Sequence, residues 1–418
     1  MVSCTPSPPL VCLPNSVAMN SMEKTATAGN KGERIRSDCK VSLQLTESGG
    51  IVLQLKSKVK DLFGRQIKEQ VEEVLKALEV DHAMVEIEDS GALPFVIGAR
   101  LEAAVKKLKT TELSWTPDLI EQNRYESHKE QFRFSRLYLP GNSPSMMLNA
   151  GIHHPNGIIL DLEDSVAPSK KGEARLLVRN ALCQVDFYGA ERMVRINQLP
   201  EGLDDLDEVI PHHVHLILIP KCENGSQVIQ VEERIEKILN GVKQQRQIYL
   251  MPIVESCMGV ENAFEIATAS ERVVALAIGL EDYTADLGVR RTEVGEESLY
   301  ARTRLVNACK AAGIQAIDSV YSDVGNMEGL KENVIRSKSL GFEGMGCIHP
   351  RQVPVIHEGF APTEVEIERA ERIKEAFNEA NSKGLGVISL GTKMIDPPVV
   401  KRALKTLDLA YSLGLRNK

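Results

Sequence analysis

The sequence predicts an α/β protein centred on a (β/α)8 TIM barrel, with a small α+β domain before it and a helical extension after it. Two observations lead to this fold class. Within residues 40–110, apolar side chains first recur at every second position, as in a strand, and then at the spacing of one helical face. From residue 136 onward, eight apolar stretches then alternate with helical segments, and such strands are typical of parallel sheets covered on both faces. The eight predicted strands are 136–139, 157–161, 192–196, 216–219, 248–254, 273–278, 314–317 and 344–348.

The small domain is predicted over residues 23–118. Its first strand alternates apolar and polar side chains, and a second strand returns after the turn at Gly49 and Gly50. A segment with apolar residues on one helical face follows. The predicted order is strand 41–45, strand 51–55, helix 61–78, strand 84–87 and helix 100–108.

The remaining boundaries follow from composition. Residues 1–22 contain four prolines and no charged side chain, which predicts a disordered tail. The polar, charged stretch 119–133 is expected to be a flexible linker. The barrel is expected to occupy 134–355, and 356–418, rich in Glu, Ala, Arg and Lys, its C-terminal helical extension.

Overall composition excludes several function classes. The net charge of −8 argues against a nucleic-acid partner. No apolar run approaches the ~20 residues that cross a bilayer, so we expect no membrane role. The eight cysteines are scattered without a CxxC pair, which indicates reduced thiols and a cytoplasmic protein. The acid-free, serine-containing N-terminus keeps mitochondrial import as a minority alternative.

Charged residues follow several of the predicted strands, where a barrel of this type has its active site. Arg195 ends the third strand, Lys221 follows the fourth, Glu255 the fifth and Asp282 the sixth. Clustered carboxylates need a cation to stay ionised, and without Cys or His nearby a hard ion is indicated. We therefore expect Mg²⁺ on Glu255 and Asp282. The alternative is that both acids only cap the following helices.

Other motifs give weaker evidence of function. His212, His213 and His215 precede the fourth strand, at the end opposite the active site, so a structural role is favoured over zinc binding. No GxSxG or dinucleotide-binding glycine motif is present, which argues against a serine hydrolase and a nicotinamide-dependent dehydrogenase.

Ordered motifs over residues 136–415 resemble the citrate lyase beta-subunit family, which includes malyl-CoA and citramalyl-CoA lyases. Motifs of the small domain resemble the citrate lyase acyl carrier protein, or gamma subunit, so the chain looks like a gamma–beta fusion. The barrel motifs are Arg136-Leu-Tyr-Leu-Pro-Gly-Asn142, Asp161-Leu-Glu-Asp-Ser165, Val194-Arg-Ile-Asn197, Ile219-Pro-Lys221, Val254-Glu-Ser256 with Gly259, Gly279-Leu-Glu-Asp-Tyr283, Ala316-Ile-Asp318 and Ile348-His-Pro-Arg351. The small-domain motifs are Phe63-Gly64, Ile87-Glu-Asp89, Gly91-Ala-Leu93, Ala99-Arg-Leu101 and Trp115.

The resemblance implies a Mg²⁺-dependent retro-aldol cleavage of a citryl thioester into oxaloacetate and an acetyl thioester. It implies substrate contacts from Arg195, Glu255, Pro220 and Lys221, with Arg195 also catalytic. Asp396 matches the family's C-terminal acid and would transfer a proton from a neighbouring subunit of a homo-oligomer. The alternative is that Asp396 caps the helix that starts at Pro397 and Pro398.

The carrier resemblance implies a phosphoribosyl-dephospho-CoA arm, loaded by a citrate lyase alpha-type acyltransferase partner. Here the sequence departs from the family, because Arg36 occupies the position of the usual attachment serine and Ser37 follows one residue later. Ser37 is the expected attachment point, on an exposed, mobile segment. Two alternatives stay open: a malyl-CoA or citramalyl-CoA lyase using free CoA thioesters with a degenerate carrier domain, and a non-catalytic scaffold for an acyltransferase.

Overall fold

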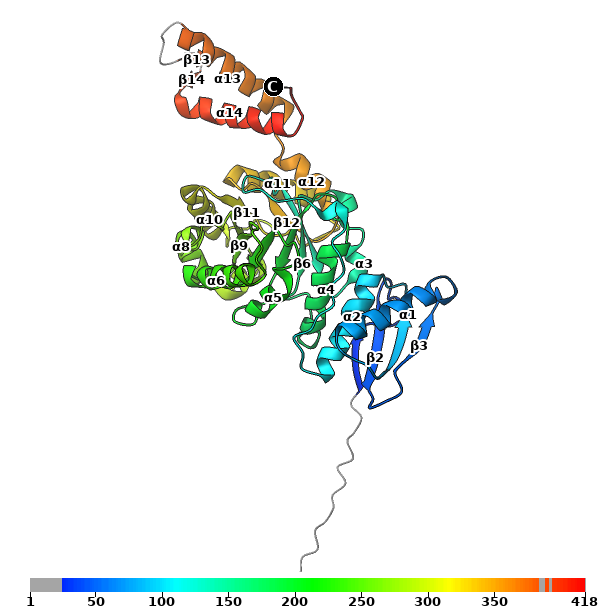
Figure 1. Cartoon of the computed structure of the whole chain (residues 1–418). Helices are drawn as coiled ribbons and strands as arrows, with labels where there is room; N and C mark the ends of the chain where they lie inside the picture. The colour runs from blue at the N-terminus through cyan, green and yellow to red at the C-terminus, as the bar shows by residue number, and fades with distance from the viewer. Residues whose placement is uncertain (1–24, 383–387, 391–392, 418) are drawn as a thin grey trace, which may run out of the picture.

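The computed structural model describes residues 25–382, 388–390 and 393–417. Figure 1 shows three parts in succession, the small domain, the barrel and the C-terminal extension. The predicted tail, residues 1–22, lies outside the described residues. Among the helices that are described, none combines the length and apolar composition needed to cross a bilayer.

The small domain is a four-stranded sheet covered by two helices. Its strand order is β1-β2-β4-β3, so β4 lies between β2 and β3, which we expected to pair with each other. The reason is helix α1, which crosses over the sheet and lets β4 run parallel to β3. Strand β1 was not predicted. The elements are β1 (Thr25–Gly29), β2 (Cys39–Leu45), β3 (Ile51–Ser57), α1 (Lys60–Ala77), β4 (Ala83–Asp89) and α2 (Pro94–Leu108).

The barrel contains the eight predicted parallel strands, which confirms the fold class. They are hydrogen-bonded in the order β11-β10-β9-β8-β7-β6-β5-β12. A parallel bridge between Asp318 and Met345 links the two ends of this order and completes the ring. The strands are β5 (Ser135–Pro140), β6 (Gly157–Asp161), β7 (Glu191–Arg195), β8 (Leu216–Ile219), β9 (Tyr249–Val254), β10 (Ala275–Ile278), β11 (Gln315–Ile317) and β12 (Met345–Cys347).

Helices surround the barrel, so its strands are buried on both faces. One apolar cluster fills the interior, where Ile159, Met193 and Met251 meet, and a larger one lies between strands and helices. The helices are α3 (Pro144–Met147), α4 (Lys171–Gln184), α5 (Gly202–Val209), α6 (Gly225–Gly241), α7 (Cys257–Glu261), α8 (Ala263–Thr268), α9 (Leu280–Leu287), α10 (Leu299–Ala312), α11 (Met327–Leu340) and α12 (Gln352–Phe360), with 3-10 turns η1 (Glu121–Asn123), η2 (Gly151–His153) and η3 (Pro168–Lys170).

The small domain is docked against the barrel through helices α2 and α4 (Figure 1). Helix α2 is buried from Phe95 to Val105 on all sides, because its own sheet covers one side and α4 the other. Ion pairs cross this contact inside the protein. Arg179 of α4 lies 2.6 Å from Glu102 of α2, and both side chains are almost completely buried.

The stretch predicted as a flexible linker, 119–133, is packed against the barrel. Asn123 is buried and its amide nitrogen donates to the carbonyl oxygen of Val185 at 2.7 Å. Arg133 is also buried and lies 2.7 Å from Glu191. Movement of this stretch away from the barrel would leave buried polar groups without partners, which is strongly disfavoured. The stretch therefore differs from a free tether.

The C-terminal extension is a pair of helices that stands away from the barrel in Figure 1. Its described buried residues form a separate apolar cluster, which includes Ile367, Val400 and Leu407. Its elements are α13 (Glu364–Ser382), β13 (Ile388–Leu390), β14 (Lys393–Ile395) and α14 (Pro397–Ser412).

Candidate active site

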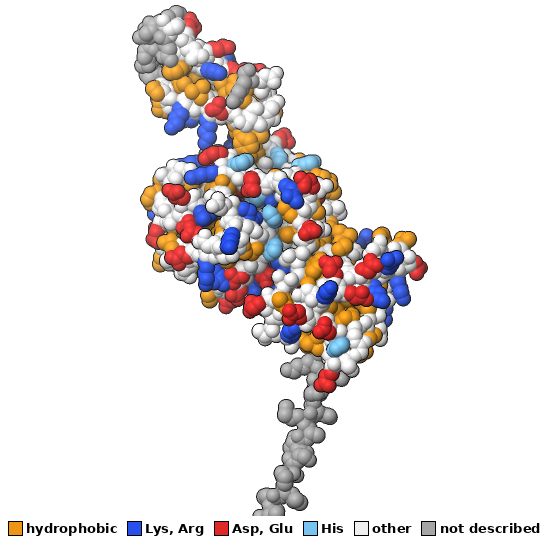
Figure 2. Space-filling model, in the orientation of Figure 1, with side chains coloured by type: hydrophobic (Ala, Val, Ile, Leu, Met, Phe, Trp, Pro, Cys, Tyr) orange, Lys and Arg blue, Asp and Glu red, His pale blue; other side chains and the backbone are white. Residues whose placement is uncertain are grey.

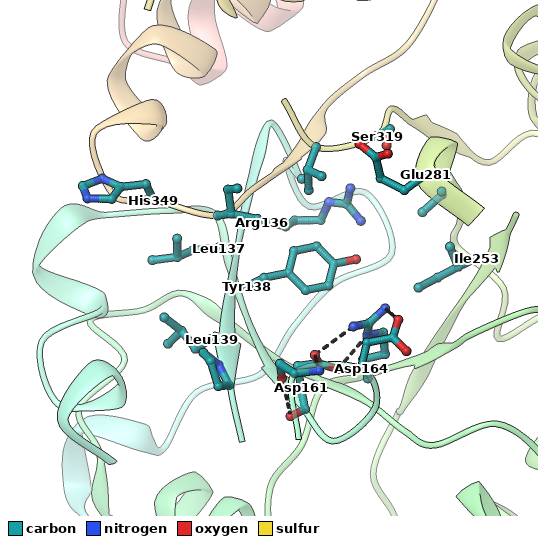
Figure 3. A pocket seen from close by; sticks show the side chains of 18 of the residues that line it. Arg136, Leu137, Tyr138, Leu139, Asp161, Asp164, Ile253, Glu281, Ser319 and His349 are labelled. Carbon is teal, nitrogen blue, oxygen red and sulfur yellow. Dashed lines mark hydrogen bonds and ion pairs between the residues drawn. The ribbon is translucent and has the colours of Figure 1, made fainter. Parts of the chain in front are cut away.

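A cavity of about 750 Å³ opens at the carboxyl ends of the barrel strands. Figure 3 shows Arg136 and Tyr138 pointing into it from β5, with Asp161 and Asp164 on one side and Ser319 on another. This is the end of the barrel at which enzymes of this fold bind their substrates.

Arg195 lies at the end of β7 and faces the cavity. Its Nε and Nη2 donate to the two carboxylate oxygens of Asp161, at 2.6 and 2.8 Å, and its Nη1 lies 2.8 Å from Glu163. Burial works to lower the pKa of Arg195, but the hydrogen bonds with Asp161 outweigh it and raise that pKa. The guanidinium is therefore a fixed positive charge in a defined orientation.

Glu255 follows β9 and is only 4% exposed. Its Oε1 accepts a hydrogen bond from the backbone N–H of Lys221 at 2.8 Å. Burial raises the pKa of Glu255 to about 8, and the nearby negative charges of Asp282 and Glu163 act in the same direction. A buried carboxylate in such surroundings favours a cation that would offset its charge.

Asp282 lies in the first turn of α9, rather than at the end of its strand as we expected. Its side chain is half-buried and lines the same cavity as Glu255. In the part of the chain that the structure describes, no group of three or more Asp, Glu, His or Cys side chains is placed to hold a metal ion. Two carboxylates still suit Mg²⁺, which commonly takes only one or two from the protein.

The predicted substrate residues Pro220 and Lys221 lie beside the cavity, and neither belongs to its wall. Pro220 is buried at the end of β8. The backbone of Lys221 has a φ of 47°, in the left-handed region. Its Nζ lies 3.1 Å from Glu163, so Lys221 contacts both Glu163 and Glu255, one through its side chain and one through its amide.

Asp396 and Ser37 are not brought into the cavity of their own chain. Asp396 is exposed and caps α14, where its side chain accepts from the backbone N–H of Val399 at 3.2 Å, as the capping alternative predicted. Ser37 is half-buried with a φ of 56°, and its backbone N–H donates to the carbonyl oxygen of Ser90. The mobile segment expected there is instead hydrogen-bonded to the sheet.

Sequence reasoning noted the acids Asp161 and Glu163 at the end of the second predicted strand but gave them no separate role. The structure shows that both hold Arg195. Arg136 and Tyr138 were noted only as motif residues, because a side chain that enters a barrel interior cannot be told from an outward one on a continuous apolar strand.

The barrel matches a protein-family model described as HpcH/HpaI aldolase/citrate lyase, over residues 135–350. The chain belongs to this family. It is therefore a lyase, related to the citrate lyase beta subunit as the sequence predicted. Residues 23–108 match a second model, described as malonate decarboxylase delta subunit, which supports the carrier-like character of the small domain.

Three relatives of this chain match most of its length. Citrate lyase subunit beta of Haemophilus influenzae is 40% identical over 291 residues, which is 69% of this chain and 100% of that protein. The Escherichia coli subunit is 37% identical over 296 residues, 70% of this chain and 98% of that protein. Human mitochondrial citramalyl-CoA lyase is 32% identical over 323 residues, 74% of this chain and 95% of that protein.

Two solved structures show the same fold. Mycobacterium tuberculosis CitE in complex with magnesium, acetoacetate and coenzyme A matches with a TM-score of 0.57 and 27% identity, over 68% of this chain and 99% of that one. The same protein with magnesium and pyruvate matches with a TM-score of 0.52 and 26% identity, over 67% and 100%.

Proposed function

We propose that this lyase cleaves a citryl thioester into oxaloacetate and an acetyl thioester, with Mg²⁺ as its cofactor. The observation that carries the proposal is the buried Glu255 beside Asp282, in the same cavity as the oriented Arg195. Two named citrate lyase beta subunits, at 37 and 40% identity, support citryl as the acyl group.

The residues of the site suit a magnesium ion held by Glu255 and Asp282. The absence of a side chain at Gly279 makes room for the Glu255 carboxylate, since a Cβ at Gly279 would lie 2.3 Å from Glu255 Oε2. A bound Mg²⁺ would supply Lewis-acid stabilisation of negative charge on a substrate oxygen.

The other side chains would bind and orient the substrate. Arg195 would hold a substrate carboxylate or a developing enolate oxygen, where a fixed charge lowers the barrier most. Asp161 and Glu163 keep Arg195 in position, and Lys221 is linked to Glu163 and Glu255. Asp396 of a neighbouring copy would transfer the proton, in a homo-oligomer.

The small domain would act as the carrier, with its arm rather than the whole domain moving. Asp38, next to Ser37, is joined to Arg100 at 3.0 Å, and Arg100 donates to the carbonyl oxygen of Asn142. Asn142 follows β5, two residues after Pro140, which lines the rim of the cavity. A phosphoribosyl-dephospho-CoA arm on Ser37 would thus start near this rim, after loading by a citrate lyase alpha-type acyltransferase. We place this chemistry in the cytoplasm.

The second candidate is a lyase for free CoA thioesters, of the malyl-CoA or citramalyl-CoA type. It is favoured by the buried contacts of the small domain and by Arg36 at the usual serine position. A non-catalytic scaffold is disfavoured, because Arg195, Glu255 and Asp282 line a common cavity.

The test is cleavage of citryl-CoA by the purified chain, with oxaloacetate measured by a coupled dehydrogenase. We expect activity that EDTA abolishes and Mg²⁺ restores. Asp282→Asn should lower turnover by about 100-fold or more, because it removes a ligand charge from the ion. Asp204→Asn, which changes an exposed acid in the first turn of α5, is the matched control.

Two outcomes would decide against the proposal. Near-normal turnover in Asp282→Asn or in EDTA would contradict the metal assignment. An unmodified peptide spanning residues 33–40, from native protein that cleaves citryl-CoA, would favour the free-CoA alternative.

A further inference from the structure

Arg136 is a buried positive charge without an acidic partner. It enters the barrel interior from β5 and is 1% exposed. Its Nη1 contacts the sulfur of Met251 at 2.8 Å, and its Nε has no hydrogen-bond partner. Within the described residues no carboxylate lies close enough to Arg136 to form an ion pair.

Other fully buried arginines of this chain have partners. Arg133 lies 2.7 Å from Glu191, and Arg179 lies 2.6 Å from Glu102. Arg192 stacks over the ring of Tyr125 at 4.4 Å and donates to the carbonyl oxygen of His213. The fold therefore pairs or stacks these buried guanidinium groups and leaves that of Arg136 without an equivalent contact.

A buried, unpaired charge is strongly unfavourable, so an anion from outside the chain is the expected partner. Burial lowers the pKa of Arg136 to about 10, which still leaves it protonated at neutral pH. The cavity reaches this side chain, since Arg136 lines it together with Tyr138, Ala277 and Gly346. In Figure 3 its side chain extends from β5 among the other residues that line the cavity.

We propose that Arg136 forms an anion site in the barrel interior for a second carboxylate of the substrate. This inference rests on the proposed lyase function and names its substrate class. A citryl group has two free carboxylates, whereas citramalyl and malyl groups have one. With Arg195 and the metal at one carboxylate, Arg136 would pair with the other, which would otherwise meet apolar side chains such as Ile253 and Ala277.

The first test compares citryl-CoA and citramalyl-CoA as substrates in the presence of Mg²⁺. We expect wild-type protein to prefer citryl-CoA, and Arg136→Met to lower the ratio of the two kcat/KM values by about 100-fold, because a buried polar recognition contact is lost. The ratio for Arg136→Lys should lie between those of the wild type and Arg136→Met, since lysine keeps the charge but not the planar, two-pronged geometry.

A second measurement does not depend on turnover. Calorimetry with Mg²⁺ present should show that Arg136→Met loses affinity for oxaloacetate far more than for pyruvate. Without ligand, Arg136→Met should melt no lower than wild type, because an unpaired buried charge is replaced by an apolar side chain. The matched control is Arg133→Met, which leaves Glu191 buried and unpaired and should melt well below wild type.

The outcomes separate this inference from the proposed function. An unchanged substrate ratio, or a melting temperature of Arg136→Met that falls as far as that of Arg133→Met, would overturn the anion site and leave the lyase assignment intact. If wild-type protein cleaves neither thioester, the proposed function fails. The oxaloacetate and pyruvate affinities of Arg136→Met then still decide whether Arg136 binds the second carboxylate.

Discussion

At the residue scale, the tightest steric constraint on the proposed metal site falls on Gly279. A Cβ at this position would lie 2.3 Å from Oε2 of Glu255 and 2.9 Å from its Cβ. Gly279 comes directly before α9, the helix that carries Asp282. The missing side chain therefore lets the two carboxylates share one end of the cavity.

Gly279→Ala should displace Glu255 without unfolding the barrel. We expect weaker Mg²⁺ binding by calorimetry and turnover lower by about 100-fold, because small misplacements of catalytic groups are costly. Gly172→Ala is the matched control, since a Cβ there meets nothing within 4 Å and its backbone is helical. Normal Mg²⁺ affinity in Gly279→Ala would show that Glu255 does not hold the ion.

The sequence predicted the charged residues of the cavity better than their contacts. Arg195 and Glu255 were found because Arg195 ends an apolar strand and Glu255 directly follows one, and strand ends define the active-site face of a barrel. The pairing of Arg195 with Asp161 joins two strands, and spacing along the chain does not reveal it. Arg136 was hidden for a related reason, because its need for a partner appears only once burial is known.

At the element scale, the strands were predictable because each is a continuous apolar run. The order of the small sheet was not, since β2 and β3 are consecutive in sequence but are separated by β4. Residues 119–133 look polar enough for a linker, yet Arg133 finds its partner Glu191 at the start of β7. Such buried pairs depend on tertiary contacts that composition does not report.

The residues before β8 give the barrel a pH-dependent stability. His215 is buried and accepts a hydrogen bond at Nδ1 from the backbone N–H of Arg192, at 3.2 Å. Its Nε2 lies 3.0 Å from the carbonyl oxygen of Tyr125. Burial, together with the charge of Arg192, lowers the pKa of His215 to about 3. The folded protein therefore keeps this imidazole neutral.

The sign of the effect follows from proton binding. In the unfolded chain a histidine takes up its proton near pH 6.5. Between about pH 6.5 and the folded pKa near 3, the unfolded state binds more protons, so the free energy of unfolding falls as the pH falls. The contribution is fully present above pH 6.5 and is lost progressively below it.

We expect the melting temperature of wild-type protein to drop more between pH 7 and pH 5 than that of His215→Asn. The variant removes the group that is protonated on unfolding, so it lowers stability at pH 7 but flattens the pH dependence. Calorimetric scans at the two pH values measure this difference. Equal drops in both proteins would contradict a neutral, buried His215.

At the scale of the whole molecule, the small domain and the barrel should unfold together. Arg179 donates to both carboxylate oxygens of Glu102 across the contact, at 3.0 and 2.6 Å, and also to Glu208. Arg179→Met removes the buried, two-pronged partner of Glu102, which then keeps only the partly exposed Lys106 at 2.9 Å, and breaking such a buried pair costs about 3–5 kcal/mol. We expect a single calorimetric unfolding transition in the wild-type protein. The transition of Arg179→Met should occur at a clearly lower temperature.

The control for this prediction is Arg65→Met. Arg65 pairs with Glu69 on the exposed face of α1, and loss of such an exposed pair should shift the transition little. Two separate transitions in wild type, or equal shifts in both variants, would mean that the domains are not joined by this contact and that the small domain can swing.

The extension carries exposed apolar side chains. Figure 2 shows hydrophobic side chains gathered over it, and Val365 of α13 is 71% exposed. Asp396 lies at the start of α14, away from the cavity of its own chain. Exposed apolar side chains on both helices of the extension, Val365 on α13 and Leu404 on α14, fit an oligomer in which α14 approaches a neighbouring barrel.

Asp396 should therefore act on the active site of a neighbouring copy. Asp396→Asn keeps the helix cap, since Asn caps as well as Asp, and removes only the ionisable carboxyl, so it should fold normally and lose turnover. Co-expressed at random with an equal amount of Glu255→Gln, it should recover about a quarter of wild-type activity, because half of the barrels are intact and half of those face an intact Asp396. Absence of recovery in oligomers shown by two affinity tags to be mixed would place Asp396 outside the catalytic machinery of its neighbour.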